Sequence, residues 1–192
     1  MVDVAATVGR IRGMVVDPDT TLAEHVQPVP PWVIVAREHA VPLIAGSAVV
    51  STVLSLVFVP AAAGGLIELV VLLVVRVAVN FGMVALMAAL VALFAGMFGG
   101  ANDFNRGFVL VTLAMTPLYV GEAVLPIPLL GTIAALGGLI YSMIILYRNI
   151  PLATGVPRTA RGRHFFMTLA SMFLILMIAG LALGPFLLPE TG

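Results

Sequence analysis

The sequence contains no cysteine and no lysine, and each absence excludes a group of functions. Without cysteine, the chain can form neither disulfides nor thiolate metal sites. Without lysine, it can contain neither a P-loop nor the Ser-x-x-Lys pattern of some hydrolases. Charge is also scarce, since 9% of the 192 residues are charged and the net charge is zero. Nucleic acid is therefore not expected as a partner, because binding it requires an excess of basic residues.

Apolar residues, in contrast, dominate the chain. They make up 61% of it, and the mean hydropathy is +1.19. A typical soluble domain has roughly 45–50% apolar residues even when glycine is counted, so this chain has more apolar surface than a soluble fold of its size can bury. Several uninterrupted apolar stretches are also long enough to cross a bilayer. We therefore expect an all-α integral membrane protein.

Five apolar segments predict five transmembrane helices. They cover residues 41–59, 67–98, 108–125, 129–147 and 165–188. The shorter ones just cross a hydrocarbon core of about 30 Å, at a rise of about 1.5 Å per residue. The second is longer than the bilayer requires, so we expect it to be tilted or to extend into the interface. Pro117 predicts a kink in the third, because proline removes a backbone hydrogen bond.

The first forty residues carry more charge than the rest and predict a short amphipathic cytoplasmic segment (1–40) before the membrane domain (41–192). Four apolar residues share one stripe of a helix: Val4, Val8, Ile11 and Val15. This stripe predicts an amphipathic helix that lies in the membrane interface and ends before Pro18. Thr21 and Glu24 have the spacing of a capping box and predict the start of a second short helix, which ends near Pro28.

All nine basic residues are arginine, and eight of them fall on one side of the five predicted spans. By the positive-inside rule, the N-terminus then lies in the cytoplasm and the C-terminus outside. Lipid headgroups are the expected partners of five arginines close to the cytoplasmic surface. These are Arg10, Arg12, Arg158, Arg161 and Arg163.

Three ionisable residues fall inside or at the ends of predicted spans: Glu68, Arg76 and Glu122. Such residues are candidates for function, because an unpaired charge in hydrocarbon is costly. Arg76 could reach either carboxylate, and Asn80 lies one turn further along the same face. Two interpretations stay open. Arg76 is either a buried structural staple, which we favour, or part of a polar site for an ion, a headgroup or a small solute.

The three histidines give no strong functional signal. Glu24-His25 and Glu38-His39 offer nitrogen and oxygen ligands, but two isolated dipeptides are weak evidence for a metal site, and we expect solvation at the interface or helix capping. His164, beside Arg161, is expected in a solvated basic loop. The HExxH, GxSxG and GxGxxG motifs are absent, so we expect no catalytic residues, no metal, no cofactor and no enzymatic activity.

Small residues at steps of four predict close packing between helices. They form four ladders: Ser47, Ser51 and Ser55; Ala88, Ala92, Gly96 and Gly100; Ala134, Gly138 and Ser142; and Gly180 with Gly184. These faces can meet within one molecule or between protomers. We favour packing within the molecule and leave a homo-oligomer open.

Several stretches follow one another in a characteristic order. They are RIRGMVVDPDTT, GGANDFNRGFVLVTLAMTPLYV, LPIPLLGTIAALGGLIYSMIILYRNIPLATGVP and a final apolar helix. In this order the chain resembles the Ypt-interacting-protein (Yip) domain family, most strongly over 99–157. The resemblance implies a five-helix fold with a cytosolic N-terminus. Eukaryotic relatives are linked to Rab-type GTPases, vesicle traffic and membrane shaping, whereas prokaryotic ones mostly lack an assigned activity.

The short N-terminal region and the arginine-only basic set favour a prokaryotic member of that family. We expect a non-enzymatic scaffold of the cytoplasmic (inner) membrane that organises the membrane or binds a partner. Membrane lipids are its expected partners, and a second copy or a protein at the cytoplasmic face are candidates. The alternative is transport of a small solute, ion or lipid through a polar site between helices.

Overall fold

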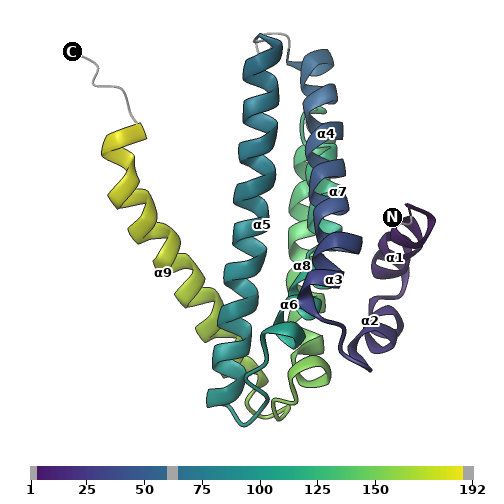
Figure 1. Ribbon diagram of the computed structural model, residues 1–192, viewed down its shortest axis with the longest axis vertical. Coiled ribbons are helices and arrows are strands. Elements are labelled where there is room, and N and C mark those ends of the chain that lie inside the picture. The colour runs from purple at the N-terminus through teal and green to yellow at the C-terminus, as the bar shows by residue number, and fades with distance from the viewer. Residues whose placement is uncertain (1–3, 60–64, 188–192) are drawn as a thin grey trace.

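The chain forms only helices over the residues that the computed structural model describes, 4–59 and 65–187 (Figure 1). The expected all-α fold is therefore confirmed. In order along the chain, the elements are α1 (Val4–Val16), α2 (Pro18–Val26), α3 (Trp32–Val35), the π-helix η1 (Ala36–Ala40), α4 (Val41–Phe58), α5 (Leu66–Met97), α6 (Phe104–Ala114), α7 (Thr116–Ala123), α8 (Leu130–Thr154) and α9 (Arg161–Leu187).

Among the described residues, four helices are long and apolar enough to cross a membrane. They are Trp32–Phe58, Leu66–Met97, Leu130–Thr154 and Arg161–Ala182. They correspond to four of the five predicted spans. The first begins nine residues earlier than predicted, the third ends seven residues later and the fourth begins four residues earlier. All three extensions point toward the end of the bundle where the loops after α5 and α8 lie, which we call the arginine-rich end (Figure 1). The first combines α3, η1 and α4 into one continuous helix and passes through residue 40, the predicted domain boundary. That division into two domains stays a prediction.

The predicted third span is divided into α6 and α7 at Met115. Pro117 lies in the first turn of α7, where its missing N–H leaves no hydrogen bond unmade. The two short helices follow each other along the bundle and run opposite to α5 and α8 (Figure 1). Their order fits a fifth crossing, which stays a prediction.

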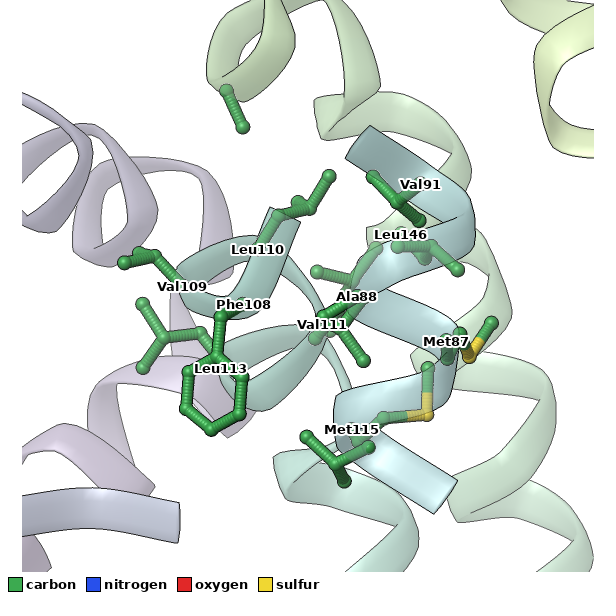
Figure 2. Packing of buried hydrophobic residues seen from close by; sticks show 14 of the residues in the cluster. Met87, Ala88, Val91, Phe108, Val109, Leu110, Val111, Leu113, Met115 and Leu146 are labelled. Carbon is green, nitrogen blue, oxygen red and sulfur yellow. The ribbon is translucent and has the colours of Figure 1, made fainter. Parts of the chain in front are cut away.

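The core of the molecule surrounds α6. Every residue from 107 to 117 is buried. Figure 2 shows the apolar side chains of α6 beside Met87, Ala88 and Val91 of α5 and Leu146 of α8. On its other sides α6 contacts α2 and α3. A helix that is apolar all round must be covered on all sides, which explains why α6 occupies the centre.

Glycines allow the helix backbones to approach closely. A Cβ atom at Gly138 of α8 would overlap the backbone oxygen of Pro117, and one at Gly107 of α6 would overlap that of Ala88. Two of the predicted small-residue ladders thus pack within the molecule, as we favoured. Gly180, in contrast, has no atom near the position of its Cβ in the described structure.

The amphipathic helix at the N-terminus forms as predicted, but its predicted apolar stripe is not the packed face. Thr7 and Met14 are buried against the bundle, whereas Val8 is 58% exposed and Val15 is also exposed. Ile11 lies between these faces and is half-buried. The helix therefore presents one face to the protein and a second face outward, where the exposed valines accompany the exposed Arg12.

The start of α2 corrects the predicted capping box. The helix begins at Pro18, three residues before Thr21. Asp17 is the N-cap, since its carboxylate accepts a hydrogen bond from the Thr20 backbone N–H at 3.3 Å. An Asp cap followed by proline at the first helical position is a stronger start signal than the one that we used.

Candidate functional site in the helix bundle

Arg76 of α5 is bound to the neighbouring helix α4. Its Nη1 atom donates a hydrogen bond to the Ser51 hydroxyl at 3.1 Å, and Ser51 is buried. Thr52, Ser55 and Arg76 contribute the polar groups of a cavity of about 200 Å³ that is otherwise lined by leucines. The hydroxyl gives the guanidinium a partner at membrane depth, where an unpaired Arg costs about 2.5–3.5 kcal/mol on insertion scales.

The two candidate carboxylates lie elsewhere. Glu68 is exposed near the start of α5, and Glu122 is half-buried near the end of α7. Arg76 is close enough to Glu122 for an electrostatic interaction. Within the described residues, however, none of the ion pairs includes Arg76, Glu68 or Glu122. The structure thus gives Arg76 a hydroxyl partner that its sequence position did not predict.

Asn80 and Glu122 line a second cavity, of about 220 Å³. The amide of Asn80 also donates to the Arg76 carbonyl at 2.9 Å, one turn earlier on α5. Methionines surround these two polar groups: Met83, Met87, Met115, Met143 and Met172. The four predicted site residues are therefore divided, because Asn80 and Glu122 share one cavity, Arg76 lines another and Glu68 lines neither.

Serine hydroxyls hold α7 between α4 and α8. The Ser47 hydroxyl donates to the Tyr119 carbonyl at 2.7 Å. The Leu118 N–H, in the first turn of α7 where no helical partner exists, donates to the Ser142 hydroxyl at 3.0 Å. From the sequence, we expected these serines only to be small residues at helix contacts. Serines at steps of four on helices next to a segment broken by proline were the available signal, because the broken segment has free backbone groups that serine hydroxyls can bind.

Two histidines that we expected in solvated surroundings are fully buried. His39, in η1, lies 3.1 Å from the Thr116 hydroxyl through its Nε2 atom. His164, in the first turn of α9, lies 2.9 Å from the Val91 carbonyl of α5. Both solvation predictions were wrong, because helix packing brings polar partners to these positions. In the part of the chain that the structure describes, no group of three His, Cys, Asp or Glu side chains could hold a metal ion.

The five arginines predicted to contact headgroups have different surroundings. Arg12, Arg158 and Arg163 are exposed. Arg10 is half-buried and pairs with Glu38 of η1 at 3.5 Å. The guanidinium of Arg161 lies 4.2 Å from the centre of the Tyr147 ring. The guanidinium of Arg163 lies 6.0 Å from the centre of the Phe98 ring. Lipid contact by these residues stays a prediction, and the geometry gives Arg10, Arg161 and Arg163 a partner within the protein.

We expect Arg76→Met and Ser51→Ala to lower the stability of the protein in a non-additive way, because both remove the same hydrogen bond. Hydrogen bonds between helices in membranes contribute about 0.6 kcal/mol on average, with a maximum near 1.7, so a coupling of about 1 kcal/mol is expected. The measurement is a double-mutant cycle on the free energy of unfolding in detergent.

Ser55→Ala provides the control, since the Ser55 hydroxyl donates within its own helix, to the Ser51 carbonyl. Its effect should add to that of Arg76→Met. Additive losses for Ser51→Ala and Arg76→Met would contradict a structural role for this hydrogen bond.

The comparisons with known proteins agree with the helical, apolar architecture. The sequence matches the family described as the Yip1 domain over residues 12–186, which is most of the chain. No curated protein and no solved structure matches it. The matched region extends from α1 into α9, so the polar residues between the helices lie within it. The chain therefore belongs to the Yip1 domain family.

Proposed function

We propose that this protein is a non-enzymatic membrane-organising protein of a prokaryotic cytoplasmic membrane, which acts by holding an amphipathic helix in one leaflet. The observation that carries the proposal is the double-faced helix α1. One face packs against the bundle through Met14, and the other presents Val8, Val15 and Val16 outward. An amphipathic helix with an outward apolar face inserts at the boundary between headgroups and acyl chains.

Direct contacts tie the N-terminal helices to the bundle. The Thr7 hydroxyl donates to the Glu38 carbonyl at 2.9 Å, and the Tyr141 hydroxyl of α8 donates to the Val15 carbonyl at 3.2 Å. Further along, Arg148 of α8 pairs with Asp19 of α2 at 2.6 Å. Because these contacts fix α1 beside the bundle, α1 widens the cross-section of the protein in one leaflet. A protein that is wider in one leaflet than in the other favours a curved bilayer.

The distribution of the arginines indicates which end of the bundle faces the cytoplasm. The loops after α5 and α8 lie together at one end of the bundle (Figure 1). Arg106, Arg148, Arg158, Arg161 and Arg163 belong to these loops or to the adjoining helix turns. By the positive-inside rule this end is cytoplasmic. Helix α1 lies beside the bundle between its middle and this end (Figure 1), so its outward face belongs to the cytoplasmic half of the bilayer.

We expect the purified protein to enrich in small, strongly curved vesicles relative to large, flat ones after reconstitution. The double variant Val8→Gln/Val15→Gln should lose this preference, because it removes the apolar face of α1. Both side chains are exposed, so the free energy of unfolding should change by no more than about 0.5 kcal/mol for each substitution. The measurement is the protein-to-lipid ratio as a function of vesicle diameter.

Ala23→Gln is the matched control, since Ala23 is exposed on α2 and lies outside the outward face of α1. This variant should keep the preference of the wild type. Equal densities of wild-type protein in small and large vesicles would refute the proposal.

Transport is the second candidate, and the cavity shared by Asn80 and Glu122 is the observation that favours it. The Glu122 carboxyl and the Asn80 amide, which both line this cavity, could bind a small cation or a polar solute. In that case, candidate solutes should raise the melting temperature of the wild type. Glu122→Gln should abolish this stabilisation while the protein stays folded.

A further inference from the structure

The seam between α8 and α9 contains an apolar groove. It has a volume of about 580 Å³, and its walls include Ile140, Met143 and Ile144 of α8 and Phe165 and Phe166 of α9. Figure 1 shows α9 leaning away from the bundle as it leaves the arginine-rich end. The volume falls within the roughly 300–1,000 Å³ of small-molecule sites.

A basic cavity of about 600 Å³ lies at the arginine-rich end of the same seam. Arg148, Arg158 and Arg161 line it, together with a single acidic residue, Asp19. The carboxylate of Asp19 is occupied by Arg148 at 2.6 Å and by the Asn149 amide at 3.1 Å. Three arginines against one aspartate leave two positive charges for an anionic group.

Two of these arginines have unused hydrogen-bonding capacity. The Nε atom of Arg161 is buried and has no hydrogen-bond partner. Arg158 is exposed, and none of the described ion pairs or side-chain hydrogen bonds includes it. Guanidinium groups bind phosphate oxygens through paired, charge-assisted hydrogen bonds. Within the described residues, no side-chain hydrogen bond includes Arg158 or Arg161, so a phosphate in the cavity would find guanidinium donors that the protein leaves available.

The groove and the cavity meet at one aromatic ring. Tyr147 lines the groove, and the guanidinium of Arg161, which lines the cavity, lies 4.2 Å from the centre of its ring. Phe165, one turn after Arg161 on α9, packs edge-on against the same ring at 5.3 Å. A charged site and an apolar groove are thus continuous along the seam.

From this continuity we propose that the α8–α9 seam binds one anionic phospholipid, with its phosphate among Arg148, Arg158 and Arg161 and an acyl chain in the groove. The arrangement follows the chemistry of such a lipid, since basic pockets between membrane helices bind anionic headgroups. The inference goes beyond the proposed function, because it needs neither α1 nor the curvature preference.

The test is native mass spectrometry and thermal melting of the full-length protein in detergent, titrated with dioleoyl phosphatidylglycerol or dioleoyl phosphatidylcholine. The wild type should bind the anionic lipid more tightly. Each arginine at an anionic lipid contributes about fivefold in affinity, so Arg158→Gln/Arg161→Gln should weaken binding about 25-fold. Arg158→Gln alone should weaken it about fivefold, and it removes no contact within the described residues.

Matched substitutions separate this site from general charge and hydrophobicity. Arg12→Gln/Arg163→Gln removes the same charge outside the cavity and should keep the affinity of the wild type. Ile140→Trp should block the groove, whereas Ile133→Trp should not. Both isoleucines are 60% exposed on α8 and lie seven residues apart on one face, but Ile133 is not part of the groove.

Three results would overturn the proposal. The first is equal loss of binding for the two double arginine variants, and the second is equal affinity for the two lipids. The third is displacement of the lipid by inorganic phosphate or glycerol phosphate, which would identify a free phosphate as the ligand instead. A deficit of Ile140→Trp relative to Ile133→Trp, with no displacement by these phosphates, supports a bound lipid.

Discussion

Phe108→Ala is expected to lower the free energy of unfolding by about 3–5 kcal/mol, the usual cost of removing a buried phenylalanine from a core. Phe108 is completely buried on α6. Its ring lies 5.8 Å from that of Trp32 and 6.0 Å from that of Phe81, measured between ring centres (Figure 2 shows its place in the core). The substitution leaves a cavity that three separate helices would have to close.

Circular dichroism during denaturant unfolding in detergent measures this effect. Fluorescence of Trp32, the single tryptophan, reports the same region. The control is Phe173→Ala, because Phe173 is 70% exposed on α9 and its loss creates no cavity. Similar losses for the two variants would show that α6 is not the core of the folded protein.

Gly138→Ala is expected to destabilise the protein by about 3 kcal/mol, the upper end of the usual cost of overpacking. The added Cβ would overlap the backbone oxygen of Pro117, and a backbone atom cannot move aside as a flexible side chain can. Helices α7 and α8 would have to separate, which would also weaken the hydrogen bond from the Leu118 N–H to Ser142.

The neighbouring Gly137 provides the control, since nothing lies within 4 Å of the position of its Cβ. Gly137→Ala should be neutral or stabilise the protein by up to about 1 kcal/mol, because alanine is a better helix former than glycine. Thermal melting of both variants, followed by circular dichroism, gives the comparison. A melting temperature of Gly138→Ala equal to that of the wild type would contradict the close approach of α7 and α8.

The sequence predicted most helices correctly because the signals for a membrane helix are local. Apolar runs placed both ends of α5 and the end of α4 within one residue, but the continuous helix that includes α4 begins at Trp32, nine residues before the predicted start. Pro117 marked the break in the third segment, although it separates two helices instead of bending one. Hydropathy did not predict where the last two helices meet the arginine-rich end. Helix α8 continues seven residues beyond its predicted end, through Arg148 and Asn149.

The candidate site was predicted only in part, because the residue types were visible and their partners were not. Arg76 and Asn80 were identified from their position in an apolar segment, and Asn80 binds the backbone of Arg76 one turn away. Ser51, the hydroxyl partner of Arg76, lies 25 residues earlier in the chain. The small-residue pattern indicated that its helix face packs, but not that it receives an arginine.

By itself, the sequence determined the membrane class, the helical content, the arginine asymmetry and the family. Each depends on composition or on residues that are neighbours along the chain. The tertiary structure alone decided which face of α1 packs inward, which polar partner Arg76 has, and that His39 and His164 are buried. Their partners lie 77 and 73 residues away, so these outcomes depend on how the helices are rotated and positioned against one another.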